Sequence, residues 1–160
     1  MKPDSHHHYW KAIGLGAVAG IRSMAAPVLL SQELSKISPV LLQGSPLRYL
    51  QAGPVAMGLK FLAASEMAGD KLPQMPDRTT LPSLAMRTAS GALVGAALFT
   101  ASRDKALTGA LIGGLAALAG TYGSFYLRQA LHRYGEVPNI VAGLLEDAVM
   151  VSSGLAIVKN

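Results

Sequence analysis

The feature that most constrains this chain is a long apolar segment without a single charge. From Ala106 to Tyr126, no Asp, Glu, Lys or Arg interrupts 21 consecutive positions. A helix over these residues has no face suited to water, and about 20 mostly apolar residues are enough to cross the hydrocarbon core of a bilayer. The alternative class is a soluble helical bundle rich in Ala and Leu, but its helices would carry polar outer faces. The segment therefore favours a membrane-spanning helix.

Other parts of the chain repeat this pattern at similar length. The expected spans cover residues 10–30, 54–69, 81–101, 106–127 and 138–158. The sequence thus predicts an all-α fold, a polytopic transmembrane helical bundle of about five spans, with a longer interfacial loop after the first. A single integral membrane domain covers residues 1–160, and residues 1–9 form a polar, His-containing leader.

Composition supports the membrane class and excludes several kinds of chemistry. Charged residues make up 14% of the chain, whereas soluble domains average about 25%. The chain has no Cys, which removes disulfides, thiolate metal sites and cysteine nucleophiles. The net charge of +5 comes from scattered Lys and Arg, a distribution that fits a membrane surface better than nucleic acid.

The basic residues of the loops do not fix an orientation for five spans. Lys2, Lys11, Lys71, Arg78, Arg128 and Arg133 would lie on the side of the N-terminus. Lys36, Arg48, Arg103, Lys105 and Lys159 would lie on the opposite side. Six against five leaves open both a single orientation and a dual-topology dimer, because the more basic side normally faces the cytoplasm.

Small residues recur at helical spacing in three of the expected spans. The pairs are Gly16 with Gly20, Gly91 with Gly95, and Gly109 with Gly113. Helices in lipid associate through close backbone approach at such positions. The pairs fit either packing within one bundle or contact between copies in a homo-oligomer, and the charge-free fourth span is the best candidate for an oligomer face.

Ionisable residues inside the expected spans point to a polar centre. Basic and acidic residues are equal in number there: the basic ones are Arg22, Lys60 and Arg87, and the acidic ones are Glu66, Glu146 and Asp147. Each charge near the centre of a membrane helix costs about 2.5–3.5 kcal/mol, so these groups must pair, lie near the interface or line a wet cavity. We expect a centre, binding a solute or an ion, built from Arg22, Glu66, Asp70, Arg87, Glu146 and Asp147. A set of ion pairs that merely fixes the helix arrangement is the alternative.

Proline in the first span suggests an opening in its backbone. Pro27 lacks the N–H that would bond the carbonyl one turn earlier, close to Ser23. Arg22 lies next to that carbonyl, near the middle of the span. Broken helices with free carbonyls often form polar sites in membranes.

A second group of chemically active side chains lies between the second and third spans. Residues 69–80 read Gly-Asp-Lys-Leu-Pro-Gln-Met-Pro-Asp-Arg-Thr-Thr. Lys71 and Arg78 suit a phosphate or lipid headgroup, and Asp70 and Asp77 suit a hard cation. The segment also fits a rigid cap for the next helix, so the sequence does not decide whether the loop binds a metal. No catalytic residue and no cofactor are assigned, because nucleophile, Walker and dinucleotide motifs are absent.

Several short motifs together resemble a known family. They are Gly-Ile-Arg-Ser-Met at 20–24, Gly-Asp-Lys-Leu-Pro at 69–73, Pro-Asp-Arg-Thr at 76–79, Arg87 with Ser90-Gly91-Ala92, and Leu-Glu-Asp-Ala at 145–148. With them the chain resembles, from about residue 14 to 158, a family of small bacterial integral membrane proteins known as a domain of unknown function. The resemblance implies a polytopic inner-membrane protein and brings no activity.

The leading hypothesis is a small, oligomeric inner-membrane protein that binds or transports a small charged solute, an ion or a lipid headgroup at the polar centre. Two others stay open. One is a membrane enzyme that acts on a lipid phosphate at the Asp70–Thr80 loop, although the sequence favours a protein that is not an enzyme. The other is a structural or assembly subunit. The expected partners are the lipid bilayer and further copies of the chain, and no nucleic acid.

Overall fold

The computed structural model describes residues 7–35, 44–69, 80–135 and 139–159. Within these ranges the chain is helical apart from short turns and bends and has no strand, which confirms the all-α class. The elements in chain order are α1 (His7–Ile21), α2 (Ala25–Leu34), the 3-10 helix η2 (Pro46–Gln51), α3 (Gly53–Gly69), α4 (Leu81–Ala101), α5 (Ala106–Gly135) and α6 (Asn139–Lys159).

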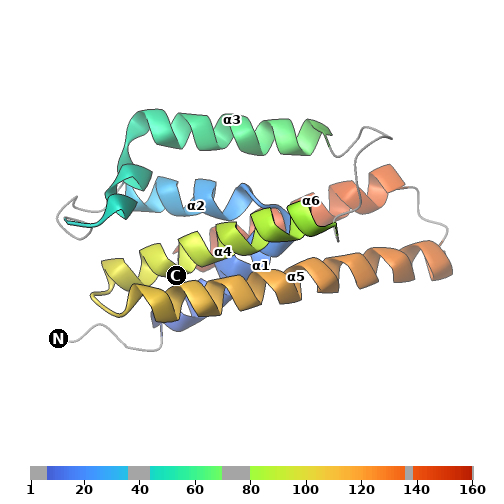
Figure 1. Ribbon diagram of the computed structural model, residues 1–160. Coiled ribbons are helices and arrows are strands. Elements are labelled where there is room, and N and C mark those ends of the chain that lie inside the picture. Colours follow the sequence, from blue (N-terminus) through green and yellow to red (C-terminus); the bar gives the residue numbers. More distant parts are fainter. Residues whose placement is uncertain (1–6, 36–43, 70–79, 136–138, 160) are drawn as a thin grey trace.

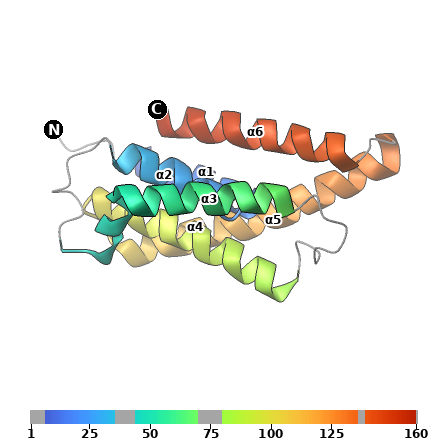
Figure 2. The same cartoon turned by 90° about the horizontal axis from the view of Figure 1, so that it is seen from above.

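The helices lie roughly parallel or antiparallel to one another along one long axis. α4 and α5 form an antiparallel pair, and α1 packs against both of them. α2 lies between this group and α3, which is the outermost helix at the top of Figure 1. The view from above in Figure 2 shows α3 in front and α6 along one side. The most closely packed part of the molecule is therefore the α1–α4–α5 group, and the hydrophobic core extends from it over α2.

Glycines hold this core group together, and we call the six of them the glycine seam: Gly16, Gly20, Gly91, Gly95, Gly109 and Gly113. A Cβ added at Gly95 would lie 2.0 Å from the carbonyl oxygen of Gly109. One added at Gly20 would lie 2.1 Å from the carbonyl oxygen of Ala117. The backbones thus touch where any side chain would separate them.

The glycine seam decides between the two roles expected for these residues. Gly16 and Gly20 pack against α5, and Gly91 and Gly95 pack against Gly109 and Gly113. All three pairs therefore lie at close contacts between helices of the one chain. Gly109 and Gly113 are buried inside the chain, so these glycines do not provide a face for contact between copies.

The residues expected to form the first span, 10–30, instead form two helices that run in opposite directions (Figures 1 and 2). A Cβ added at Gly154 of α6 would lie 3.9 Å from Cγ1 of Val18 and 2.4 Å from Cδ1 of Leu29. In one straight helix Val18 and Leu29 would be about 16 Å apart, at about 1.5 Å per residue. We call this unit the α1–α2 hairpin, with its tip at residues 22–24.

The position of Pro27 explains why a new helix begins here. Pro27 is the third residue of α2, in the first turn, where a missing N–H costs no helical hydrogen bond. If α1 continued through residue 27, the helical hydrogen bond from the N–H of that residue would be missing. The proline ring would also lie against the preceding turn. The chain therefore ends α1 at Ile21 and starts α2 at Ala25.

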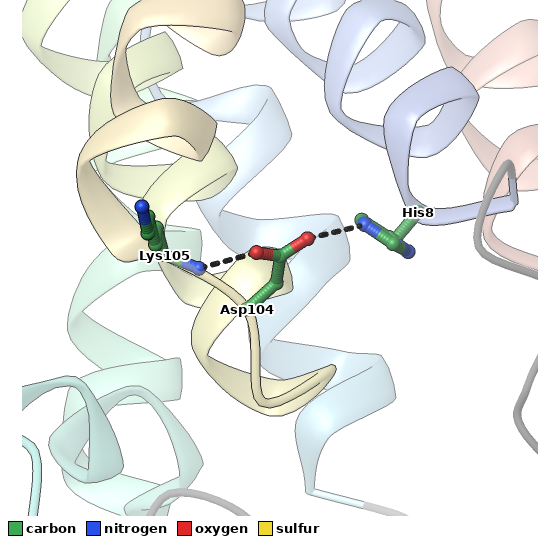
Figure 3. A network of polar contacts seen from close by, with 3 residues as sticks. All are labelled: His8, Asp104 and Lys105. Carbon is green, nitrogen blue, oxygen red and sulfur yellow. Dashed lines mark hydrogen bonds and ion pairs between the residues drawn. The ribbon is translucent and has the colours of Figure 1, made fainter.

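Both ends of the α1–α2 hairpin lie at the end of the bundle that holds the α4–α5 turn, which we call the hairpin base (Figures 1 and 2). His8 Nε2 lies 3.3 Å from Oδ2 of Asp104 in that turn (Figure 3). The His8 ring also packs edge-on against the buried Phe99. The last part of the expected polar leader, from His7 to Tyr9, is thus the first turn of α1.

The other arm of the hairpin is fixed at the base by η2. Ser31 Oγ donates a hydrogen bond of 2.6 Å to the carbonyl oxygen of Leu50. Gln51 Nε2 donates one of 2.9 Å to the carbonyl oxygen of Leu34, the last residue of α2. Part of the loop expected after the first span is therefore a short helix packed on α2.

Among the described residues, two helices are long and apolar enough to cross a membrane: α4, and α5 from Ala106 to Ala130. α4 occupies the same residues as the third expected span. α3 and α6 coincide within one residue with the second and fifth, and α5 extends to Gly135, beyond the fourth. Helices therefore lie at the four positions expected after residue 53, with α5 longer than expected, and two of the four meet the length and hydropathy of a membrane span.

Candidate polar site at the hairpin tip

The tip of the α1–α2 hairpin lies inside the bundle, near the middle of the two longest core helices. It contacts Ser90, the tenth of the 21 residues of α4. Gly20, two residues before the tip, contacts Thr121, the sixteenth of the 30 residues of α5. Arg22 and Ser23 are buried, with exposed fractions of 3% and 8%. Non-helical backbone at this depth needs partners for its polar groups.

Glu66 of α3 supplies acceptors for the N–H groups of the tip. Its Oε1 accepts hydrogen bonds from Ser23 N at 3.0 Å and Ser23 Oγ at 2.8 Å. Its Oε2 accepts one from Met24 N at 3.1 Å. These donors lie just ahead of α2, whose N-terminus carries partial positive charge, so a carboxylate is electrostatically favourable there.

Arg87 of α4 supplies donors for the carbonyls that end α1. Its Nη1 donates to the carbonyl oxygens of Gly20 and Ile21, both at 2.6 Å. Its Nε donates to Ser83 Oγ, one turn earlier on α4, at 3.2 Å. The C-terminal end of a helix carries partial negative charge, so the guanidinium group complements it.

Two hydroxyl groups complete the partners of the tip. Ser90 Oγ donates a hydrogen bond to the carbonyl oxygen of Ser23. This is the carbonyl that the missing N–H of Pro27 was expected to leave free, although it lies here between two helices and not at an opening within one span. Thr121 Oγ1 lies 3.0 Å from the carbonyl oxygen of Gly20 and 2.8 Å from that of Ala117 on its own helix.

The site places opposite charges at the two helix ends that the tip separates. Glu66 lies at the start of α2, Arg87 lies at the end of α1, and the three residues of the tip separate them. A carboxylate or other small anion suits the first position, and a cation suits the second. The chain itself occupies both positions in this structure.

The structure brings together three of the residues predicted for the polar centre. Arg22, Glu66 and Arg87 meet at the hairpin tip, although they come from the tip itself, α3 and α4. Lys60, which was counted among the charges inside the spans, is exposed on α3.

Other predicted site residues lie outside the described part of the chain. Asp70, Lys71, Asp77 and Arg78 precede residue 80, and the side chains of Glu146 and Asp147 in α6 are not among those described. Thr80 is the N-cap residue of α4, but its side chain makes no capping hydrogen bond. Within the described ranges no three His, Asp or Glu side chains converge as metal ligands would.

The sequence analysis missed the hydroxyl and carbonyl groups of the site. Ser90 follows Arg87 by three residues, so both lie on one face of α4, and this spacing was a usable signal. Thr121 had no comparable signal, because nothing in α5 shows that its hydroxyl faces the end of α1. The role of the carbonyls of Gly20 and Ile21 as acceptors could be recognised only once the position where α1 ends was known.

The comparison with known families agrees with the family resemblance seen in the sequence. A family described as a domain of unknown function, DUF4126, matches residues 10–159. The chain belongs to this family. The match to the DUF4126 family includes the α1–α2 hairpin, Glu66 and Arg87. No curated protein matches the chain significantly, and no solved structure does.

Proposed function

We propose that this chain is a multi-pass protein of the bacterial inner membrane, in which α3, α4, α5 and α6 cross the bilayer and the α1–α2 hairpin enters it from one side. Large apolar side chains cover the outside of the bundle. On α5, Leu107, Leu111 and Leu115 are 60–73% exposed, and on α3, Met57 and Phe61 are 74% and 75% exposed. Lipid tails are the natural surroundings for such a surface.

The hairpin tip fits the rule for irregular backbone inside membranes. Such backbone is tolerated where protein surrounds it or where it lines a water-filled cavity. Side chains of α3, α4 and α5 bond the polar groups of the tip. We therefore treat the hairpin as a re-entrant element, a form found in channels and carriers.

The hairpin also changes which loops share a side of the membrane. Among the described residues, the hairpin base holds Lys11, Arg48, Arg103, Lys105 and Lys159. The opposite end holds Arg128 and Arg133. Five against two favours a hairpin base in the cytoplasm.

Within this membrane fold, the proposed function is the binding and passage of a small charged solute or ion at the hairpin tip. One observation carries the proposal: Glu66 and Arg87 place opposite charges at the two helix ends of a re-entrant tip. Ionisable side chains within a membrane are costly and typically serve ion or solute paths. Carriers often bind ionic groups at the ends of interrupted helices.

Flux into liposomes tests this function. The purified protein is reconstituted, and gradients of potassium, chloride and acetate are applied separately while a voltage-sensitive dye reports charge movement. We expect flux above protein-free vesicles for at least one probe, and at least about a tenfold change of that flux in Glu66→Gln. Lys60→Gln is the matched control, since Lys60 is charged, exposed and on the same helix. Absence of flux with every probe, or unchanged flux in Glu66→Gln, contradicts the proposal.

A second candidate is a structural or assembly subunit. The specific observation in its favour is that the chain's own side chains bond the described carbonyls and N–H groups of the tip. This role predicts no flux with any probe and a partner protein that copurifies with the chain from native membranes. The liposome experiment therefore separates the two candidates.

A further inference from the structure

Helix α3 covers the hairpin, but apolar packing holds it weakly. None of its described side chains is fully buried, and Leu59 is its side chain that packs against the hydrophobic core. Both views show α3 as the outermost helix, next to α2. Its opposite face carries the exposed Met57 and Phe61. A helix held in this way needs other contacts to stay in place.

Glu66 provides those contacts near the C-terminal end of α3. Among the described side chains of α3, it is the one that bonds another part of the chain, with three hydrogen bonds to Ser23 and Met24. Hydrogen bonds to a charged group are about twice as strong as neutral ones. The side chain that positions α3 is therefore the one that closes the tip.

The N-terminal end of α3 has a fixed base on which the helix can pivot. η2 directly precedes α3 and is bonded to α2 through its last two residues, Leu50 and Gln51. Ala52 and Gly53 link the two helices, and a Cβ added at Gly53 or Gly58 would meet no atom within 4 Å. No described residue packs against α3 at these two glycines, so a small rotation there moves the end that bears Glu66.

We propose that α3 is a gate over the hairpin tip and that Glu66 is its clasp. In the closed state, described here, the carboxylate occupies the N–H groups of Ser23 and Met24. In the open state α3 pivots at Ala52–Gly53, these three hydrogen bonds break, and the tip becomes accessible beside Ser90 and Arg87. A solute would reach the proposed site only in the open state, but the gate itself can be tested without any solute.

The absence of cysteine makes the test direct, since single cysteines report access at chosen positions. Ser90→Cys reports the tip, and Ser31→Cys reports the far end of α2; both serines are buried, at 6% and 0% exposure. A small, water-soluble thiol reagent is applied to each full-length variant in liposomes, with Glu66 intact and with Glu66→Ala.

We expect the reaction rate at position 90 to rise at least about tenfold with Glu66→Ala, because one hydrogen bond to a charged group is worth about that factor in an equilibrium. The rate at position 31 stays unchanged. If Glu66→Ala is not recovered in membranes, Glu66→Gln gives the same comparison with a smaller rise. An unchanged rate at position 90 overturns the gate, and so does an equal rise at position 31, which means general loosening. Neither result depends on flux, so failure of the gate and failure of solute passage are distinguishable.

Discussion

The glycine seam and the hairpin tip both hold α1 in place, but they do so by opposite means. At the seam the backbones of α1, α4 and α5 touch, and a single added carbon would lie 2.0–2.6 Å from a carbonyl oxygen. At the tip the backbone is irregular, and charged or hydroxyl side chains from three other helices bond it. The seam has no alternative arrangement of similar packing, whereas the bonds of the tip can be exchanged for others. We therefore expect the seam to be rigid and the tip to be the part that changes conformation.

The largest effect is expected at the seam. Gly95→Leu places a whole side chain where a Cβ alone would lie 2.0 Å from the carbonyl oxygen of Gly109. We expect no stably folded protein, because separating α4 from α5 also removes the surface on which α1 packs. Gly123→Leu is the matched control on α5, since nothing lies within 4 Å of a Cβ added there. Yield and thermal aggregation of the detergent-extracted protein provide the measurement. A Gly95→Leu protein as stable as Gly123→Leu would remove the contrast between seam and tip.

A smaller but still large effect is expected for Arg87→Met, which keeps the length of the side chain. The carbonyls of Gly20 and Ile21 lose their charged donor. We expect a loss of about 3–6 kcal/mol in the free energy of unfolding, because two hydrogen bonds to a charged group are lost, each worth about 1.5–3 kcal/mol. Lys60→Met serves as control, because Lys60 is exposed, and should change this free energy by less than about 0.5 kcal/mol. Denaturation in mixed detergent micelles reports both values, and equal losses would mean that Arg87 does not hold the end of α1.

The smallest effect in this series is expected for Ser90→Ala. It removes the hydroxyl that bonds the carbonyl oxygen of Ser23 and changes little else. We expect a loss of about 1 kcal/mol, typical of one neutral hydrogen bond, in the same micelle assay. Ser152→Ala is the comparison, since its hydroxyl bonds the carbonyl of Val149 on an exposed face of its own helix. If Ser90→Ala and Ser152→Ala lost the same free energy of unfolding, the hydrogen bond between α4 and the tip would make no measurable contribution to stability.

The helices of the second half were predictable because apolar runs and charge-free length act locally. The ranges expected for α4 and α6 agree with the structure within one residue. The α1–α2 hairpin was not predictable in the same way. Its residues read as one apolar run of membrane-spanning length, and the reversal depends on Glu66, Arg87 and Ser90, which follow the tip by more than 40 residues.

The candidate site shows the same division. Arg22, Glu66 and Arg87 were identifiable because a charge within an apolar run is conspicuous and costly. That Glu66 bonds N–H groups and Arg87 bonds carbonyls was not identifiable, since those groups are free only where α1 ends and α2 begins. Pro27 gave the one local hint, and the carbonyl it leaves free is the partner of Ser90.

The central claim, that α1 and α2 form a re-entrant hairpin, is tested most directly by labelling single cysteines from each side of sealed inner-membrane vesicles. Ser5→Cys lies ahead of α1, Arg48→Cys between α2 and α3, and Gln129→Cys near the opposite end of α5. The hairpin predicts that a membrane-impermeant maleimide labels positions 5 and 48 from the same, cytoplasmic side and position 129 from the other. Labelling of positions 5 and 48 from opposite sides would show that residues 10–30 cross the membrane as one span, and would contradict the account.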